Sequence, residues 1–298
     1  MILVAGGTGT LGREIVARLT AAGREVRVLT RDAARVTGPD VQVAIGDVRH
    51  PSSLTSAVKG ARAVISAVHG FQGGRAAGPE EVDHKGNRNL VRAAVDAGVL
   101  HFVLVSVLDA GPDHPMSLHR AKYDAEQALQ ASALSWTVLR PSSYVETWMD
   151  IVGNKIASGG PALVFGRADN PINFVSIQGV AILAERAISD QALRGQTIDV
   201  PGPVNLTMEQ LARQLGASKI RHIPRGALRL LSTILPPWAP AFARQTRAAL
   251  VMDTTDMTAD ASALLARFPD ISWHPATEIA KQYRAAVAAH PRVDRHKW

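Results

Sequence analysis

Seven residues near the start of the chain, Gly6-Gly7-Thr8-Gly9-Thr10-Leu11-Gly12, constrain its fold more than any other segment. Residues 1–5 before them are apolar, as in a buried parallel strand, while Ile15, Val16 and Leu19 after them have helical spacing. Glycines also mark ordinary turns, but a strand before them and a helix after them favour a binding turn. Such a turn brings backbone N–H groups and the positive end of a helix dipole to a pyrophosphate. The pattern predicts a dinucleotide-binding site.

The first half of the chain alternates between strands and helices, which predicts an α/β fold. We expect a doubly wound parallel sheet, a Rossmann fold with strand order 3-2-1-4-5-6. Residues 1–150, rejoined by 172–200, should form the NADP-binding domain, and residues 151–171 and 201–298 a smaller, mostly helical C-terminal cap. The predicted strands are 1–5, 25–30, 41–45, 62–67, 101–106, 136–139 and 197–200. The predicted helices are 13–22, 80–98, 116–131, 177–189, 228–235, 238–252 and 276–289, with a further helix opening at a capping box at residues 207–210.

Composition narrows the class of protein. With 298 residues, 46% apolar and 20% charged, the chain has the make-up of a globular protein. It has no cysteine, and its ten histidines show no ligand spacing, so we predict neither disulfides nor a metal site. A strand from Ile2 leaves no room for a signal peptide, and we expect a cytoplasmic protein. The apolar stretch 230–243 is short and holds three prolines, so we expect a pocket-lining or interface helix and no membrane partner.

The formal net charge of +7 raises the question of an anionic partner. Most basic residues are scattered among acidic ones, and the only dense basic run is 292–297. We therefore expect a solvated surface and tail and no nucleic-acid partner, with part of the excess charge serving a phosphorylated cofactor. The expected partner is a small-molecule substrate, and a homodimer is left open.

The end of the second predicted strand bears on the choice of nucleotide. NAD-binding folds usually carry an acidic residue there, but this chain has Thr30 followed by Arg31. A hydroxyl and a guanidinium bind a 2′-phosphate that an acid would repel, which favours NADP(H) over NAD(H). The alternative is that Arg31 simply lies on the surface.

Two later loops should also reach the cofactor. Asp47 and Val48 follow the third strand, where a carboxylate accepts a hydrogen bond from the adenine amino group; alternatively, Asp47 caps the next turn. Ala67, Val68 and His69 follow the fourth strand and should run past the ribose and pyrophosphate.

Taken together, these motifs resemble the short-chain dehydrogenase/reductases, in particular the atypical NmrA-like branch with its isoflavone-reductase-like and quinone-reductase-like members. The resemblance covers about two thirds of the chain and is specific for the superfamily but not for a substrate. The residues that carry it are 6–12, Thr30-Arg31-Asp32, Gly46-Asp47-Val48, 82–87, 93–99, 102–106, Lys122 and Leu139-Arg140-Pro141, and more weakly 171–176 and Gly202-Pro203.

The resemblance implies a serine, a tyrosine and a lysine as catalytic residues, with the last two spaced as Y-x-x-x-K on one helix. Ser106 and Lys122 match, and the lysine would hold the nicotinamide ribose, but Leu118 stands where the tyrosine belongs. His119 is the best local acid, or else a surface residue; the alternative for Lys122, whose register with Ser106 and the glycines favours the functional role, is a solvated helix lysine. Tyr144 offers a hydroxyl from the cap side, or is a core aromatic.

Three functions remain open. The first is an NADPH-dependent reductase acting on a quinone, an enone or a similar small apolar acceptor, whose reduced product needs only a weak acid. The second is a non-catalytic NADP(H)-sensing regulator of the NmrA type. The third is an epimerase or dehydratase, disfavoured because it depends on the missing tyrosine. The aromatic residues expected to line a substrate pocket are Trp148, Phe165, Phe174 and Trp238.

Overall fold

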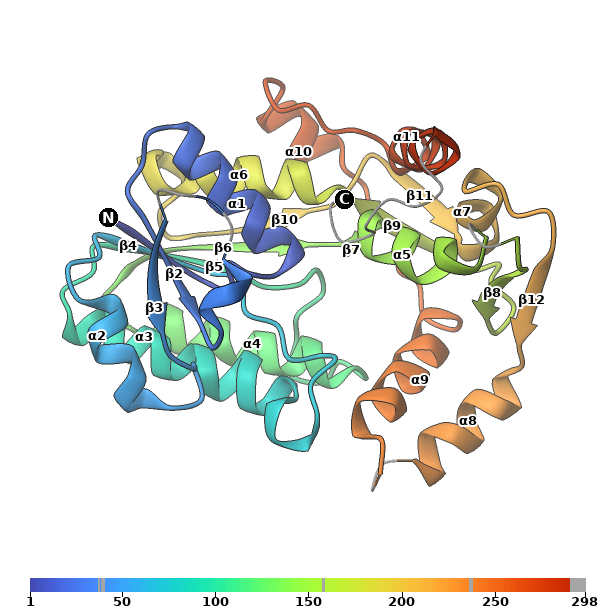
Figure 1. Ribbon diagram of the computed structural model, residues 1–298, viewed down its shortest axis with the longest axis horizontal. Helices are drawn as coiled ribbons and strands as arrows, with labels where there is room; N and C mark the ends of the chain where they lie inside the picture. The colour runs from blue at the N-terminus through green and yellow to red at the C-terminus, as the bar shows by residue number, and fades with distance from the viewer. Residues whose placement is uncertain (37, 39–40, 157–158, 236–237, 290–298) are drawn as a thin grey trace. The chain divides into compact units, whose positions relative to one another are not determined.

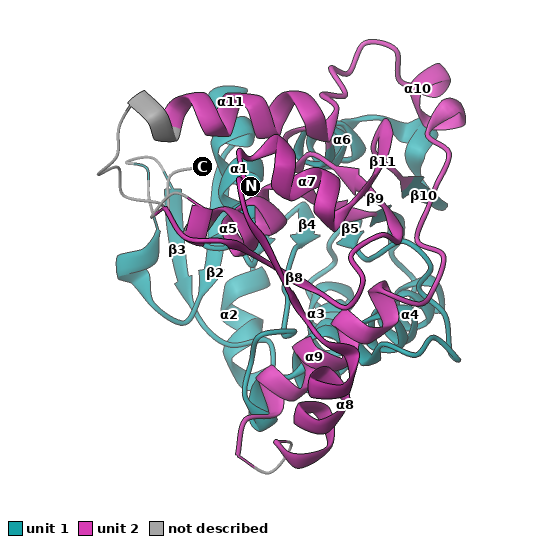
Figure 2. Cartoon of the chain, turned by 90° about the vertical axis from the view of Figure 1, so that its right-hand side faces the viewer, with its two compact units in different colours: residues 1–141, 180–199 teal, residues 142–179, 200–298 magenta. Residues whose placement is uncertain are grey.

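The computed structural model describes residues 1–36, 38, 41–156, 159–235 and 238–289. The basic run 292–297, and Pro236 and Pro237 of the apolar stretch, lie outside these residues. The chain divides into two compact units, residues 1–141 with 180–199 (unit 1) and residues 142–179 with 200 onward (unit 2), coloured separately in Figure 2. The boundary expected at residue 150 falls inside helix α5, Val145–Ile156, which belongs whole to unit 2.

Unit 1 is built on a seven-stranded sheet with the order β10-β6-β5-β4-β1-β2-β3. Neighbouring strands from β3 to β6 pair in parallel, which confirms the predicted Rossmann fold and strand order, and β10 adds a seventh strand beside β6. The strands are β1 Ile2–Ala5, β2 Val26–Thr30, β3 Val41–Ile45, β4 Ala63–Ser66, β5 His101–Val105, β6 Ser135–Pro141 and β10 Gln196–Val200.

Helices cover both faces of this sheet, with α1 and α6 on one side and α2, α3 and α4 on the other (Figure 1). Burial on two faces explains why β1, β4 and β5 are continuous apolar runs with hardly any alternation. The apolar stripe of α1 is buried as its spacing predicted, at Ile15, Val16 and Leu19. The helices are α1 Thr10–Ala21, α2 Leu54–Val58, α3 Asn87–Asp96, α4 Ser117–Gln130 and α6 Ile177–Ser189.

The predicted helix 80–98 is not uniform. It opens as a π-helical turn, Glu80–Gly86, and continues as α3, after which Gly98 reverses the chain with a φ of +67°. Asp83 and Gly86 are buried in the wide turn, and a Cβ on Gly86 would lie 2.6 Å from a methyl group of Val48. π-helical turns often occur at functional sites, and this one brings a carboxylate into the interior.

Unit 2 contains a three-stranded sheet, β11-β9-β7, and a parallel pair, β12 with β8. Its apolar core gathers side chains from α5, α7, α11 and these strands. The strands are β7 Ser143–Tyr144, β8 Ala162–Phe165, β9 Pro171–Val175, β11 Val204–Thr207 and β12 Ile220–Ile223. The remaining helices are α7 Met208–Gln214, α8 Arg225–Ile234, α9 Pro240–Met252, α10 Ser262–Arg267 and α11 Ala276–Ala289; α7 opens on the predicted capping box of Thr207 and Gln210.

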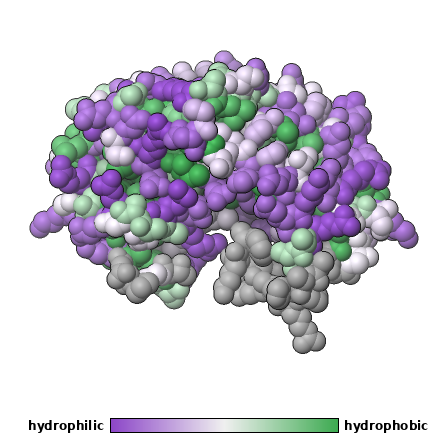
Figure 3. Space-filling model, turned by 90° about the horizontal axis from the view of Figure 1, so that it is seen from above, coloured by the Kyte–Doolittle hydropathy of each residue, from purple (hydrophilic) through white to green (hydrophobic). Residues whose placement is uncertain are grey.

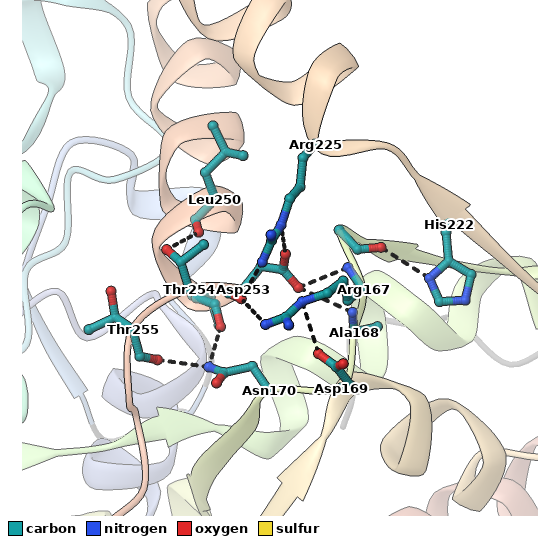
Figure 4. A network of polar contacts seen from close by, with 12 residues as sticks. Arg167, Ala168, Asp169, Asn170, His222, Arg225, Leu250, Asp253, Thr254 and Thr255 are labelled. Atoms are coloured by element: carbon teal, nitrogen blue, oxygen red, sulfur yellow. Dashed lines mark hydrogen bonds and ion pairs between the residues drawn. The ribbon is translucent and has the colours of Figure 1, made fainter.

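A buried carboxylate ties the end of α9 to the rest of unit 2 (Figure 4). Asp253, the C-cap of α9, accepts hydrogen bonds from the backbone N–H groups of Arg167 and Ala168 and from the Arg225 guanidinium. The guanidinium also donates to the Asp253 carbonyl oxygen at 3.0 Å. Because Arg225 begins α8, this network fixes the first residue of α8 to the last turn of α9.

The outer surface is mixed in polarity. On the face drawn in Figure 3, hydrophilic residues predominate and hydrophobic ones form separate patches between them. Within the described residues, none of the helices combines the length and the apolar content that a bilayer crossing needs.

Candidate functional site

The glycine turn of unit 1 is held by very close backbone contacts. Gly6 has a φ of +84°, and a Cβ there would lie 2.5 Å from the carbonyl oxygen of Ala67. A Cβ on Gly12 would lie 2.1 Å from the carbonyl oxygen of Gly6, and one on Gly7 2.9 Å from a methyl group of Val28. These three glycines are therefore required by the packing of the turn against the loop after β4, the start of α1 and β2.

Gly9 differs, because packing does not explain its missing side chain. It is exposed, and an added Cβ would meet one atom beyond its own neighbours, the Gly6 carbonyl oxygen at 3.3 Å. As the N-cap of α1 it supplies no side-chain hydrogen bond to the helix. Thr10 is exposed, Thr8 half-buried and Leu11 buried. The first N–H groups of a helix have no acceptor within it, so this end of α1 fits a pyrophosphate.

At the end of β2, the two residues expected near a 2′-phosphate have different environments. The buried Thr30 hydroxyl donates to the Asp32 carbonyl oxygen at 3.0 Å and so stays within its own turn. Arg31 is exposed, and its charge acts on the nearby Asp47 carboxylate. Arg31 is therefore the side chain of this pair that a ligand can reach.

Asp47 lies at the end of β3 and already has a partner. Its carboxylate accepts from the Arg49 guanidinium at 3.0 Å and from the Arg49 backbone N–H at 3.0 Å. The Arg49 hydrogen bonds foremost, with a minor contribution from Arg31, hold the pKa of Asp47 below its ordinary value. The turn-capping alternative thus describes the observed contacts, and the contact with adenine stays a prediction. Val48 is a core residue against Gly86.

The loop after β4 passes directly over the glycine turn. The backbone of Ala67 and Val68 lies against Gly6, as the close contacts above show. Val68 is buried, whereas about half of the His69 side chain is exposed, with its ring stacked on Phe71. The structure therefore places this loop beside the glycine turn, and its contact with the ribose and pyrophosphate stays a prediction.

Lys122 is buried on α4, and its ammonium group has two hydrogen-bond acceptors and one ion-pair partner. It donates to the carbonyl oxygens of Val68 and Val105, each at 2.9 Å, and lies 3.1 Å from the Asp83 carboxylate. Asp83 also accepts from the Gly70 N–H at 2.8 Å. Lys122 thus connects the loop after β4 to the end of β5, and its contact with a nicotinamide ribose stays a prediction.

The partners of Lys122 were missed at the sequence level. Asp83 is fully buried, and its carbonyl oxygen accepts from the Asn87 amide, which in turn accepts from the Ser66 hydroxyl. Asn87 shares its helix stripe with the buried Leu90 and Ala94. A polar residue on an apolar stripe was the available signal.

Ser106, after β5, also forms a hydrogen bond within the protein. Its hydroxyl donates to the fully buried Glu126 carboxylate, which the Arg140 guanidinium also contacts through two hydrogen bonds. An ionised carboxylate only accepts hydrogen bonds, so the serine proton points to Glu126 and the serine oxygen keeps only acceptor capacity. Glu126 follows Lys122 by four residues on the same face of α4, a spacing that the sequence analysis did not use.

His119 is buried, contrary to the surface alternative. Its ring stacks on His114 at 3.8 Å, and its Nδ1 finds no hydrogen-bond partner among the described residues. Burial foremost, and then His114, lower the pKa of His119 from 6.5 to about 3. The ring is therefore neutral at neutral pH. Leu118, in the tyrosine position, is half-buried.

We expect His119 to destabilise the protein in acid. The unfolded chain takes up the proton near pH 6.5 and the folded chain only near pH 3, so stability rises with pH in this interval and is lost as the pH falls through it. His119→Phe keeps a stacking ring that does not titrate. The fall in the free energy of unfolding between neutral and acid pH should therefore be smaller in this variant by about 1–3 kcal/mol. Urea unfolding at several pH values measures it; curves parallel to the wild type would contradict it.

The aromatic residues expected around a substrate have different environments in unit 2. Trp148 and Phe165 meet edge to face at 6.4 Å and line a small pocket with Met208. Phe174 is a fully buried core residue, and Trp238 is largely exposed. The hydroxyl of Tyr144 is buried without a partner among the described residues, and burial raises its pKa.

No metal site is evident in the described part of the chain, where no three or more His, Cys, Asp or Glu side chains are grouped to hold an ion.

Comparison with known proteins agrees with this geometry. A (4-alkanoyl-5-oxo-2,5-dihydrofuran-3-yl)methyl phosphate reductase of Streptomyces griseus is 31% identical over 81% of this chain and 84% of its own. An NAD(P)H azoreductase of Xenophilus azovorans is 29% identical over 77% of this chain and 78% of its own. The structure of an NADPH-dependent quinone oxidoreductase of Escherichia coli with NADPH superposes with a TM-score of 0.76 and 21% identity, covering 95% of this chain and 99% of that one.

The family assignment rests on the region that contains the glycine turn, the loop after β4, Ser106 and Lys122. A model of the NAD(P)H-binding family matches residues 6–163, more than half of the chain. This confirms the NAD(P)-binding class that the motifs indicated. The chain belongs to the NAD(P)H-binding family.

Proposed function

We propose that this protein is an NADPH-dependent reductase of a small apolar acceptor such as a quinone or an electron-poor alkene. The observation that carries the proposal is the open N-terminus of α1 at Gly9, framed by glycines that packing requires. The reductase activities of the relatives described above support it. When bound, the cofactor supplies a hydride from C4 of its nicotinamide.

Different residues of the chain would bind different parts of the cofactor. The turn from Gly6 to Gly12 would receive the pyrophosphate on its backbone N–H groups. Arg31, the exposed cation at the end of β2, would bind a 2′-phosphate. Lys122 would act as a positioning residue, since its bonds to Val68 and Val105 fix the loop after β4 and the end of β5, beside which a nicotinamide ribose would lie.

The class of substrate follows from which side chains could donate a proton to the reduced product. A simple ketone needs a positioned acid, because hydride transfer leaves an alkoxide. Here Ser106 donates to Glu126, the ammonium of Lys122 donates to two carbonyl oxygens and pairs with Asp83, and His119 is neutral. A quinone or an electron-poor alkene yields a delocalised anion instead, and water suffices to protonate it. This arrangement favours acceptors of the second kind.

The direct test mixes the purified protein and NADPH with quinones, enones and simple aliphatic ketones, and follows the loss of nicotinamide absorbance. We expect turnover with quinones or enones and none with the ketones. Equal or faster reduction of the ketones would contradict the acceptor class. Tight NADPH binding without turnover of any acceptor would instead favour the NADP(H)-sensing regulator.

Ser106→Ala should change quinone reduction little. The serine proton is committed to Glu126, which keeps its Arg140 contacts in the variant. We expect kcat within about threefold of the wild type, whereas removing a group that stabilises a developing oxyanion costs about 10²–10³. Steady-state kinetics decide, and a hundredfold loss would make Ser106 a catalytic donor.

Arg31→Ala should weaken NADPH binding much more than NADH binding. A charge-assisted hydrogen bond to the 2′-phosphate contributes about 1.5–3 kcal/mol, a roughly tenfold to hundredfold change in Kd. Fluorescence titration with both coenzymes measures the difference. An equal effect on the two Kd values would remove Arg31 from this role.

A further inference from the structure

The helical hairpin of α8 and α9 in unit 2 exposes an unusual number of apolar side chains. Among the described residues, nine large apolar side chains are exposed, and four of them, Leu230, Ile234, Trp238 and Phe242, lie within one short segment. Trp238 is the most exposed of the nine, at 79%. We name these four residues the apolar tip. Clustered exposed apolar residues usually mark a surface that meets a partner.

The helices explain how the tip is presented. On α8, Leu228 and Ser232 are buried, whereas Leu230 and Ile234 are exposed and lie one turn apart on the opposite face. The two helices lie side by side in Figure 1 and Figure 2, and Arg247 of α9 donates to the Ser232 carbonyl oxygen. The far end is held by the Asp253 network of Figure 4. These contacts hold α8 and α9 together, while the apolar tip between them stays exposed.

The charge of the surrounding segment is one-sided. Residues 210–252 contain no Asp or Glu, and they hold seven basic residues, a number equal to the formal net charge of the whole chain. Two of them pair with the acids that flank the segment, Arg213 with Glu209 and Arg225 with Asp253, so residues 209–253 carry a formal excess of five positive charges. The seven are Arg213, Lys219, Arg221, Arg225, Arg229, Arg244 and Arg247.

This combination selects one kind of partner. An interfacial helix pairs apolar residues, tryptophan among them, with Lys and Arg, and binds where acyl chains meet anionic headgroups. A second copy of this chain fits less well, because two segments that each carry a positive excess would repel each other. Nucleic acid would use the charge but leave the apolar tip in water.

We propose that the apolar tip docks the protein peripherally on an anionic lipid surface. Trp238 and Phe242 enter the headgroup and acyl boundary, while arginines of α8 and α9, such as Arg229, lie at the level of the lipid phosphates. The contact is reversible and in the plane of the surface. The proposal differs from the sequence-based expectation of no membrane partner, which rested on the absence of a spanning segment.

The test is flotation of the full-length protein with vesicles of phosphatidylcholine alone and of equimolar phosphatidylcholine and phosphatidylglycerol. The wild type should float with the anionic vesicles and lose binding as salt rises. Trp238→Ser/Phe242→Ser should bind at least roughly tenfold more weakly, and Arg229→Gln roughly fivefold. Leu100→Ser, a 57% exposed leucine of unit 1, is the matched control and should bind like the wild type.

Three results would overturn the proposal. The first is an absence of flotation with anionic vesicles. The second is a loss in the Arg229 variant but not in the tip variant, which would indicate a site for any polyanion. The third is a dimer in sedimentation that only the tip variant breaks, without vesicle binding by the wild type, which would make the tip an interface between copies. Circular dichroism and the thermal midpoint verify that each variant is folded.

Discussion

Gly12→Ala is expected to abolish NAD(P)H binding. The new Cβ would lie 2.1 Å from the carbonyl oxygen of Gly6 and 2.7 Å from its carbonyl carbon, so the turn or the start of α1 must move. We expect a loss of about 1–3 kcal/mol in the free energy of unfolding, as in overpacked cores, because backbone cannot give way as a side chain does. The displaced N–H groups would no longer converge on a pyrophosphate. Urea unfolding and coenzyme titration measure the two effects.

Gly9→Ala separates binding from folding. Its backbone, at φ −80° and ψ 171°, suits alanine, and the added Cβ meets only the Gly6 oxygen at 3.3 Å. We expect stability within about 1 kcal/mol of the wild type and NADPH binding at least roughly tenfold weaker. Gly111→Ala, with no contact closer than 3.8 Å, should change neither quantity. Wild-type affinity in both Gly9→Ala and Gly12→Ala would place the dinucleotide elsewhere.

Lys122→Met is expected to destabilise the protein more than Gly12→Ala does. It leaves Asp83 as a buried carboxylate without its counter-charge and removes the lysine donor from the Val68 and Val105 carbonyl oxygens. Breaking one partner of a buried ion pair costs about 3–5 kcal/mol. The free energy of unfolding from urea titration gives the value.

Two further variants identify the cause. Lys85→Met removes the lysine of an exposed ion pair with Glu81 and should leave the unfolding midpoint nearly unchanged. Asp83→Asn combined with Lys122→Met should be less destabilised than the sum of the single variants, because neither then leaves a charge unpaired. Additive losses, or a mild Lys122→Met, would show that the buried pair is not what holds the two loops.

The features that could be predicted from the sequence are those that neighbouring residues specify. The glycine turn between an apolar run and a helical stripe is local, so its position, the order of the first six strands and the dinucleotide fold followed from it. Ser106 and Lys122 could be located in the same way, by their places after β5 and on α4. What these side chains bind was beyond such reasoning.

The surroundings of these residues depend on segments that are distant in sequence. The acceptors of Lys122 come from the loop after β4, the end of β5 and the π-helical turn, and that of Ser106 comes from α4. Hydrophobic periodicity in the sequence cannot predict such tertiary contacts. Periodicity can identify a polar residue on the apolar stripe of a helix, and Asn87 on α3 and Glu126 on α4 are two such residues. The burial of His119 and the exposure of Trp238 likewise reflect tertiary packing.

The central claim is that the turn from Gly6 to Gly12 binds a pyridine dinucleotide through its backbone. Isothermal titration of NADPH into the wild type and into Gly9→Ala tests it most directly, since the added Cβ meets only one atom, the Gly6 carbonyl oxygen at 3.3 Å. The account predicts saturable heat at one site in the wild type and a strongly weakened site in the variant. Correctly folded wild-type protein that gives no heat with NADPH or NADH would contradict it.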